Sequence, residues 1–308
     1  MSAVGSSCTI EVDGREVTCT NVDKVLWPAV ELTKGWLISY YDAVADALLP
    51  HITGHPVTLH RFPDGVDAPH WYQTRAPAHP PWVRTLTTRP ERTGKVFDVV
   101  VLDSRASLLW AANLASIELH PYLGREPDVE HPTAAVFDLD PGAPAGIQET
   151  ARVGMALHAL LDGLALHSVV KTSGNAGLHV YVPLNEPHRY SHTKTFARAV
   201  AEILRQESPG HVITKMARRH RVGKVFVDWS QNDAGKSTVA PYSLRGNAIP
   251  TVSAPLTWDE VARVAEAGTS SHLPVTAADV LDRLDRLGDL FHDVLTMRQH
   301  LPDGELAR

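Results

Sequence analysis

Ala134-Ala135-Val136-Phe137-Asp138-Leu139-Asp140-Pro141-Gly142 is an apolar run that ends in two acids and a turn. Alternate side chains of a β-strand share a face, so Asp138 and Asp140 are expected on one face and Phe137 and Leu139 on the other. Pro141-Gly142 ends the strand and leaves both carboxylates at its carboxyl edge. Because neighbouring carboxylates repel each other, a bound cation would explain the pair. An exposed strand end with an ordinary turn would also explain it.

Length and composition indicate a globular protein with a sizeable core. The chain has 308 residues, 44% of them hydrophobic, and it shows no internal repeat or low-complexity linker, so we expect one domain. No apolar run is long enough to cross a bilayer, and the first residues lack a basic segment followed by an apolar one. These features favour the cytoplasm and no membrane partner.

The charge distribution restricts how the protein could bind nucleic acid. A formal net charge of −6 argues against a surface that is positive throughout. Basic residues nevertheless crowd the short segment 215–224. That segment predicts either a local groove for a polyanion or an ordinary solvated charge run.

Periodicity predicts a mixed α/β (α+β) fold. Asp13-Gly14 reads as a two-residue hairpin turn that places Cys8 opposite Cys19, a position that permits a cross-strand disulfide. In a reducing compartment two free thiols are expected instead. Further strands are expected at 57–62, 168–172, 178–182 and 224–229. Helices are expected at about 37–49, 104–119, 148–164, 191–206, 258–267 and 277–299.

Two more features join the acidic strand. A glycine-rich turn, Ser173-Gly-Asn-Ala-Gly177, connects two strands, with His179 just after it, and Asp228 interrupts the apolar strand Val225-Phe-Val-Asp. A carboxylate in an apolar strand is costly unless it is paired or binds metal. Three carboxylates can hold two divalent ions for nucleotidyl transfer, and backbone amides of a tight turn can bind a triphosphate. For His179 alone, a packed core histidine is the ordinary alternative.

The order of these motifs resembles the primase-polymerase domain of bacterial ligase D, a member of the archaeo-eukaryotic primase superfamily. The resemblance rests on Phe137-Asp-Leu-Asp-Pro-Gly, on Thr172-Ser-Gly-Asn-Ala-Gly-Leu-His-Val-Tyr-Val-Pro-Leu184 and on Val227-Asp-Trp-Ser-Gln-Asn232. It extends over Asn21–Pro28, Glu118–Pro121, Val239–Arg245 and Pro255–Asp259, and so covers nearly the whole chain.

The resemblance implies a residue set for each part of the reaction. It assigns two Mn²⁺ or Mg²⁺ ions to Asp138, Asp140 and Asp228. It assigns the incoming ribonucleotide or deoxyribonucleotide triphosphate to His120, Ser173, Gly174, Gly177, His179, Gln231 and Arg245. It assigns DNA to Lys24 and Lys34, as a pocket for a 5′-phosphate, and to Arg61, Trp71 and Tyr72, near the template.

The resemblance also implies a function and a domain plan. The family extends 3′-hydroxyls at short gaps and broken ends bearing a 5′-phosphate, generally prefers ribonucleotides, and works in end joining or excision repair at the nucleoid. The domain would span 1–300, with a hairpin and DNA-binding part over about 1–130, a catalytic core over about 131–250, and closing helices over about 255–300. Residues 301–308 would form a flexible tail.

Two departures from the family pattern leave other functions open. Relatives commonly carry a lysine where Ala176 stands, which puts the strength of triphosphate binding in question. No Lys-x-Asp-Gly adenylation motif of a ligase is present, so a separate ligase, and an end-binding protein, are expected as partners. The alternatives are a catalytically weak protein that binds or bridges DNA ends, and a metal-dependent nuclease or phosphoesterase.

Overall fold

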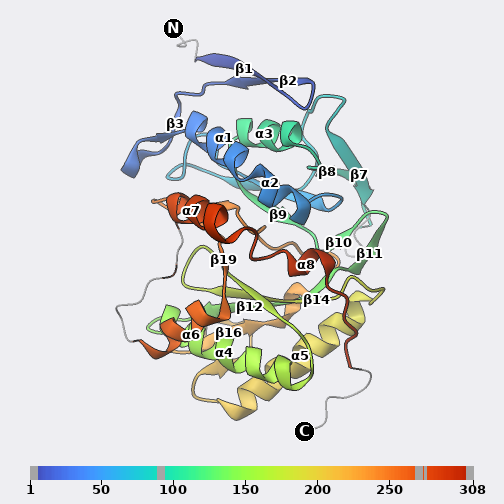
Figure 1. The fold of residues 1–308 in the computed structure, drawn as a ribbon, viewed down its shortest axis with the longest axis vertical. Helices are drawn as coiled ribbons and strands as arrows, with labels where there is room; N and C mark the ends of the chain where they lie inside the picture. Colours follow the sequence, from blue (N-terminus) through green and yellow to red (C-terminus); the bar gives the residue numbers. More distant parts are fainter. Residues whose placement is uncertain (1–5, 89–93, 268–272, 274–275, 303–308) are drawn as a thin grey trace. The chain divides into compact units, whose positions relative to one another are not determined.

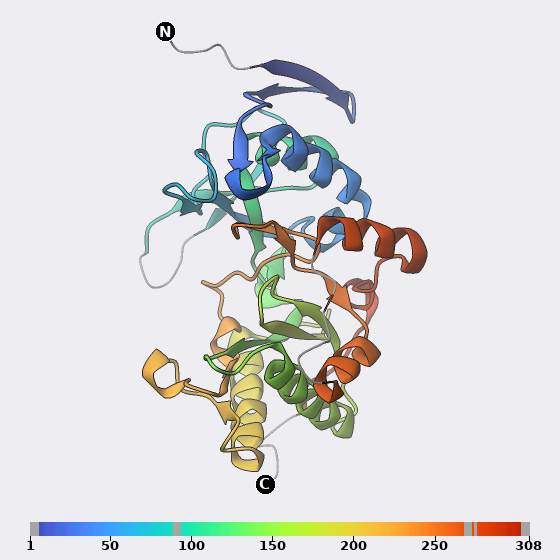
Figure 2. The ribbon, with the colours of Figure 1, turned by 90° about the vertical axis from the view of Figure 1, so that its left-hand side faces the viewer.

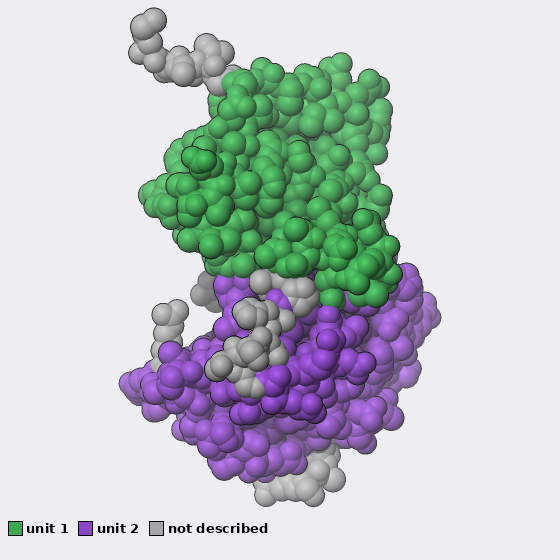
Figure 3. Space-filling view, turned by 60° about the vertical axis from the view of Figure 1, so that its left-hand side comes forward, with its two compact units in different colours: residues 1–122, 237–253, 276–288 green, residues 123–236, 254–275, 289–308 purple. Residues whose placement is uncertain are grey.

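The computed structural model describes residues 6–88, 94–267, 273 and 276–302. The chain divides into two compact units, coloured separately in Figure 3. Unit 1 comprises residues 1–122, 237–253 and 276–288, and unit 2 comprises residues 123–236, 254–275 and 289–308. The single domain over 1–300 stays a prediction, and residues 303–308 of the expected tail lie outside the described part of the chain.

A six-stranded sheet forms the centre of unit 2, with the acidic strand β12 (Ala134–Pro141) inside it (Figure 1). The strand order is β15-β16-β12-β14-β13-β19. All neighbouring strands are antiparallel except the β15–β16 pair, which is parallel. The other strands are β13 (Val169–Thr172), β14 (Leu178–Pro183), β15 (Val212–Ile213), β16 (Val225–Asp228) and β19 (Pro255–Leu256).

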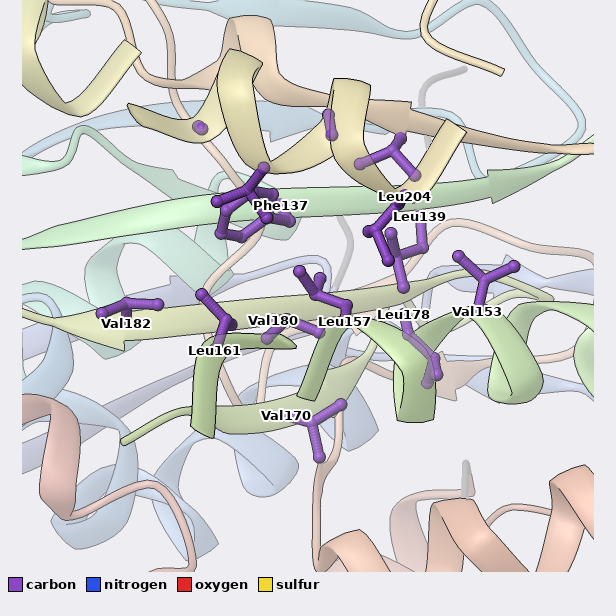
Figure 4. Close-up of a cluster of buried hydrophobic side chains, with 14 of the residues drawn as sticks. Phe137, Leu139, Val153, Leu157, Leu161, Val170, Leu178, Val180, Val182 and Leu204 are labelled. Carbon is purple, nitrogen blue, oxygen red and sulfur yellow. The ribbon is translucent and has the colours of Figure 1, made fainter. Parts of the chain in front are cut away.

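Alternation along these strands separates a core face from a second, polar face, which also carries a smaller apolar cluster that includes Ala134, Val136, Val169 and Tyr181. Phe137, Leu139, Val170, Val180 and Val227 all belong to one buried cluster, most of which is drawn in Figure 4. Their sequence neighbours point to the other face of the sheet, because side chains of a strand alternate with period two. The residues on that second face include the acids of the strand that defines the fold.

Three helices cover the core face. They are α4 (Ile147–Gly163), α5 (Tyr190–Glu207) and α6 (Trp258–Glu266), and all three contribute side chains to the same cluster. Figures 1 and 2 show α4 in green and α5 in yellow on the same side of the strands. The Glu149 carboxylate accepts the backbone N–H of Gly146, and Thr257 and Glu260 form a capping box, so two of the helices begin with satisfied amides. Unit 2 also contains a hairpin, β10 (Gly124–Arg125) and β11 (Asp128–Pro132), and the short helix α8 (Asp293–Thr296).

Unit 1 contains a second sheet in the order β6-β5-β8-β7, with β9 also paired to β5. These strands are β5 (Pro56–Arg61), β6 (Trp71–Gln73), β7 (Arg84–Thr88), β8 (Phe97–Val101) and β9 (Ser116–Pro121). The helices are α1 (Lys34–Ala43), α2 (Ala45–Leu48), α3 (Arg105–Asn113) and α7 (Ala277–Leu287). Short pairs are formed by β3 (Val25–Trp27) with β4 (Leu32–Thr33) and by β17 (Leu244–Arg245) with β18 (Thr251–Val252).

The amino-terminal hairpin has the predicted register. Strands β1 (Ser7–Val12) and β2 (Arg15–Thr20) place Cys8 directly opposite Cys19, and both thiols are free. Burial raises the pKa of the Cys19 thiol to about 11, with smaller upward contributions from Cys8. Cys19 therefore carries a protonated, weakly reactive thiol at neutral pH.

Two predicted helices were too long. The helix expected at 104–119 ends at Asn113, and residues 116–121 form β9 instead. Ala115 has a left-handed backbone conformation (φ 55°), which ends the helical path and turns the chain into a strand that pairs with β5. The helix expected at 277–299 ends at Leu287, where Gly288 also has a positive φ of 68°. None of the described helices is long and apolar enough to span a membrane.

Candidate active site

The three predicted metal ligands lie together on the polar face of the unit 2 sheet. Asp138 on β12 is directly opposite Asp228 on β16, and Asp140 lies two positions further along β12, opposite Phe226. Directly opposed side chains of an antiparallel pair have Cβ atoms about 5 Å apart. The register therefore concentrates three carboxylates at the end of one strand pair.

Hydrogen bonds fix the Asp228 carboxylate. Its Oδ1 accepts the backbone N–H (2.8 Å) and the hydroxyl (2.6 Å) of Ser230, and its Oδ2 accepts the side-chain amide of Gln231 (3.2 Å). Asn232 continues this motif by pairing its side-chain amide with the backbone N–H and C=O of Val136 on β12. The segment after Asp228 is thereby tied to the strand that carries the other two acids.

The basic segment 215–224 reaches the same acids. The Arg221 guanidinium lies 3.7 Å from Oδ2 of Asp140 and stacks on the Phe226 ring. Gly142 allows this approach, because a Cβ there would stand 2.0 Å from the carbonyl oxygen of Arg221. The close packing at Gly142 therefore keeps the Arg221 guanidinium beside the Asp140 carboxylate.

The glycine-rich turn packs tightly against β12. A Cβ on Gly177 would stand 2.8 Å from the Leu139 carbonyl oxygen and 2.9 Å from Oγ of Ser173, so only glycine fits. The backbone N–H groups of Gly174 and Asn175 donate to the hydroxyls of Thr172 and Ser173. A phosphate bound at this turn would therefore have to replace these hydroxyl oxygens as the acceptor of the two amides. The anion-binding role of the turn stays a prediction.

His179 connects the turn to the acids. Its Nε2 lies 3.3 Å from Oδ1 of Asp138, and its Nδ1 lies 2.9 Å from Nζ of Lys171. Both His179 and Lys171 are buried. The ring therefore lies between an amine and a carboxylate, and its role in nucleotide binding stays a prediction.

In unit 1, His120 and Arg245 meet at one buried carboxylate. Oε2 of Glu118 lies 2.8 Å from His120 Nε2, 3.3 Å from an Arg245 guanidinium nitrogen and 3.2 Å from His60 Nδ1. Burial alone would raise the pKa of Glu118, but the hydrogen bonds from His120 and His60 and the charge of Arg245 outweigh it and hold the pKa well below its ordinary value. Burial lowers the pKa of His120 and keeps its ring neutral, although the Glu118 carboxylate opposes that shift.

His60, Glu118 and His120 also satisfy the spacing of a metal site. One ligand atom from each lies within 4.8 Å of the others, and all three residues are buried. Arg245 nevertheless places a positive charge on the same Glu118 oxygen, and the backbone N–H of Gly246 donates to the other oxygen at 3.0 Å. A carboxylate already facing four donors favours a hydrogen-bond network over a divalent ion.

The two lysines predicted to bind a 5′-phosphate lie in different environments. The Lys24 side chain is 40% exposed and pairs with Asp64 at 2.6 Å. Lys34 is buried at the start of α1, where its ammonium donates to the Asn113 carbonyl oxygen at 3.0 Å. Burial, with a smaller contribution from the nearby charge of Lys24, lowers the pKa of Lys34. Lys24 is therefore the more accessible of the two cations.

The predicted template residues divide between two faces of one strand pair. Arg61 on β5 is directly opposite Trp71 on β6, and its guanidinium lies 5.5 Å from the centre of that ring. Tyr72 points to the other face, where it stacks on His60 at 3.9 Å between ring centres. Both aromatics are exposed, but they cannot form one continuous platform.

Several residues of these networks were given no site role from the sequence, although three of them lie in motifs or in the basic segment quoted above. They are His60, Asp64, Glu118, Lys171, Arg221 and Asn232. A charged residue inside an apolar strand was the available signal for Lys171 and Glu118, and it is the same signal that identified Asp228. The other partners depend on contacts between distant parts of the chain.

Comparisons with known proteins match most of the chain. Residues 33–291 match the family described as LigD, primase-polymerase domain. The chain is 40% identical over 277 residues to the multifunctional non-homologous end joining protein LigD of Mycolicibacterium smegmatis, covering 89% of this chain and 35% of that protein. It is 31% identical over 288 residues to the bifunctional LigD protein of Bacillus subtilis, covering 92% of this chain and 45% of that protein.

A solved structure shows the same fold. The polymerase domain of Mycobacterium tuberculosis ligase D, determined in complex with DNA, matches with a TM-score of 0.84 and 40% identity, over 91% of this chain and 98% of that domain. The chain thus spans 35% and 45% of these two full-length relatives but 98% of this one domain. It belongs to the LigD primase-polymerase domain family.

Proposed function

We propose that the protein is a metal-dependent DNA primase-polymerase, a nucleotidyltransferase that adds nucleotides to a 3′-hydroxyl. The observation that carries this proposal is the position of Asp138 directly opposite Asp228, with Asp140 on the same strand face. Membership of the primase-polymerase family supports the same chemistry.

The donor set at this strand end fits hard divalent cations. The three side chains offer only carboxylate oxygens, which suit Mg²⁺ and Mn²⁺. Two ions held by Asp138, Asp140 and Asp228 would activate the 3′-hydroxyl and neutralise the triphosphate and its leaving pyrophosphate.

The protein's own groups prepare this site in several ways. Ser230 and Gln231 fix the orientation of Asp228 by hydrogen bonds to both of its oxygens. The turn containing Ser173, Gly174 and Gly177 is packed onto β12, next to the acids, and would receive the triphosphate. His120, Gln231 and Arg245 are proposed nucleotide contacts on the strength of the family motifs.

We propose as substrate a gap or broken end that carries a 5′-phosphate. Lys24 and Lys34 would bind that phosphate, and Arg61, Trp71 and Tyr72 would hold the template strand. The related mycobacterial domain was solved with DNA, and the relatives are named for non-homologous end joining. This chain is accordingly proposed to act in end joining or gap repair, with a preference for ribonucleotides and with a separate ligase and an end-binding protein as partners.

The test is extension of a labelled primer on a gapped duplex with Mn²⁺ or Mg²⁺. We expect extension that is stronger when the gap carries a 5′-phosphate and stronger with ribonucleotides than with deoxyribonucleotides. Tight binding without extension at any nucleotide or Mn²⁺ concentration would instead identify an end-binding protein. Shortening of the labelled strand without added nucleotide would identify a nuclease.

A further inference from the structure

Three histidines of unit 2 cluster near the start of α5, and none of them belongs to the proposed active site. His188 and His192 are four residues apart, and His300 lies in the segment 297–302 that follows α8. A hydrogen bond joins the Nδ1 atoms of His188 and His192, which are 3.2 Å apart. The ring centres are 5.1 Å apart for this pair and 5.9 Å apart for His188 and His300. His188 is therefore the central ring of a cluster of three imidazoles.

The distances in this cluster match the spacing of ligands around one metal ion. Imidazole nitrogens bound at about 2.0–2.1 Å to a tetrahedral Zn²⁺ lie about 3.3 Å from each other, and their ring centres lie about 5 Å apart. The Nδ1 atoms of His188 and His192 already have this separation. An ion could therefore replace their hydrogen bond after small rotations of the two rings.

His300 would supply the third ligand after a change of its side-chain rotamer. Among the described residues, only His60, Glu118 and His120 have ligand atoms that all lie within 4.8 Å of one another. His300 is exposed and lies outside the helices and strands, so its ring can turn toward the other two. Water can fill the remaining position of a tetrahedral ion.

The chemistry of the cluster favours a transition metal over Mg²⁺. Burial, with smaller contributions from His192 and His300, lowers the pKa of His188, which favours the neutral, metal-binding form of its ring. Imidazole nitrogens suit ions such as Zn²⁺, Cu²⁺ and Ni²⁺, whereas Mg²⁺ prefers oxygen ligands. The cluster therefore differs in metal preference from the carboxylates on β12 and β16.

A bound ion would join the segment 297–302 to the start of α5. This segment already contacts the end of β14 through Gln299, whose backbone N–H donates to the Leu184 carbonyl oxygen (3.1 Å) and whose side-chain amide donates to the Pro183 carbonyl oxygen (2.8 Å). Helix α5 contributes to the core of unit 2. An ion that cross-links the two segments in the folded chain should stabilise this unit.

We propose that His188, His192 and His300 form a binding site for a divalent transition-metal ion of the Zn²⁺ type, which fastens the segment 297–302 to the start of α5. The role is structural. The inference does not depend on the proposed polymerase activity, because its ligands and its tests are separate from the carboxylate site.

The direct test uses Co²⁺ as a probe, because tetrahedral Co²⁺ with imidazole ligands absorbs visible light and Zn²⁺, which is colourless, displaces it. The whole chain is titrated in excess Mg²⁺, which competes for the carboxylates. We expect one absorbing Co²⁺ per chain. His300→Ala should weaken Zn²⁺ binding at least about tenfold, whereas His292→Ala, a matched exposed histidine just before α8, should bind Zn²⁺ like the wild type.

Thermal unfolding tests the link between the ion and the fold. Zn²⁺ at about a hundredfold excess over its Kd should raise the melting temperature of the wild type and of His292→Ala by about 5 °C. The same Zn²⁺ should leave His188→Ala and His300→Ala nearly unchanged. His300 is exposed, so its variant should fold even if His188→Ala does not.

Two results would refute the proposal. The first is wild-type Zn²⁺ affinity in His300→Ala, which would exclude the three-histidine site. The second is a Co²⁺ absorption that is lost in His60→Gln but kept in His300→Ala, which would place the ion at the Glu118 cluster instead.

Discussion

Asp138 on β12 lies directly opposite Asp228 on β16, although ninety residues of chain separate them. Their side chains point away from the hydrophobic cluster that contains Leu139 and Val227, so the core holds the strands while the other face carries the charge. Two like charges at this separation weaken the fold unless a cation compensates them. The core of unit 2 thus stabilises a site that is electrostatically unfavourable by itself.

Lys24 and its partner Asp64 predict opposite effects on the binding of a 5′-phosphate. Lys24→Ala should weaken binding to a 5′-phosphorylated gap about three- to tenfold, because it removes an accessible cation. Asp64→Asn should strengthen the same binding, because it frees Lys24 from a competing carboxylate. Fluorescence anisotropy with gapped DNA that ends in a 5′-phosphate or a 5′-hydroxyl measures the affinity of both variants. Equal changes in affinity for the two DNAs would show that Lys24 does not bind the 5′-phosphate.

The Glu118 network predicts how stability depends on pH. The pKa of folded Glu118 lies below the ordinary 4.5, so its stabilisation is present above that value and is lost as the pH falls further. The lowered pKa of His120 acts in the same direction at higher pH, since the unfolded chain protonates near the ordinary 6.5 before the folded chain does. The melting temperature should therefore fall on acidification below about pH 7.

Glu118→Gln isolates the carboxylate part of that dependence. Between pH 5.5 and pH 3.5 its melting temperature should fall less steeply than that of the wild type, while Glu11→Gln, at an exposed position of the hairpin, should follow the wild type. Parallel curves for Glu118→Gln and the wild type would show that the network does not stabilise the folded carboxylate.

Gly177 and Gly163 form a matched pair for the glycine-rich turn. Gly177→Ala forces a Cβ against the Leu139 carbonyl and Ser173, which should cost about 1–3 kcal/mol and raise KM for the nucleotide. Gly163→Ala, in the last turn of α4 with nothing within 4 Å of the new Cβ, should be neutral or stabilising by up to about 1 kcal/mol. Thermal unfolding and nucleotide titration of both variants measure these effects. A Gly177→Ala variant with wild-type stability and KM would show that the close contacts at Gly177 do not restrict the turn.

Ala176 is exposed, so the turn has room for a lysine at this position. Ala176→Lys should lower KM for the nucleotide about three- to tenfold through one added charge–phosphate contact, and the gain should shrink as salt is added. The measurement is single-nucleotide extension at two ionic strengths. An unchanged KM at low salt would show that the side chain at 176 does not face the triphosphate.

Alternation and turn chemistry made the centre of unit 2 predictable. The period-two pattern placed Asp138 and Asp140 on one face, and the isolated acid in an apolar strand identified Asp228. In the amino-terminal hairpin of unit 1, the position of Cys8 opposite Cys19 was predictable from the Asp13-Gly14 turn, because a two-residue loop fixes the register of its strands.

The sequence patterns could not predict contacts between residues that lie far apart in the chain. Glu118 was placed in a helix because the left-handed residue Ala115 carries no sequence signal of its own, and its partners come from positions 60, 120 and 245. Trp71 and Tyr72 lie outside every strand predicted from the sequence, whereas the structure places them in β6, facing opposite sides. Pairing with β5 outweighed the local proline-rich composition.

The most direct test of the metal-dependent site is Mn²⁺-dependent extension of a primer on a 5′-phosphorylated gap by Asp138→Ala, compared with Asp233→Ala. Asp233 is a carboxylate of the same unit that pairs with Lys194 and lies outside the proposed ligand set. We expect Asp138→Ala to bind the gapped DNA nearly as well as the wild type but to extend no primer, while Asp233→Ala extends it normally. Extension by Asp138→Ala at the wild-type rate would contradict the role of Asp138 as a metal ligand.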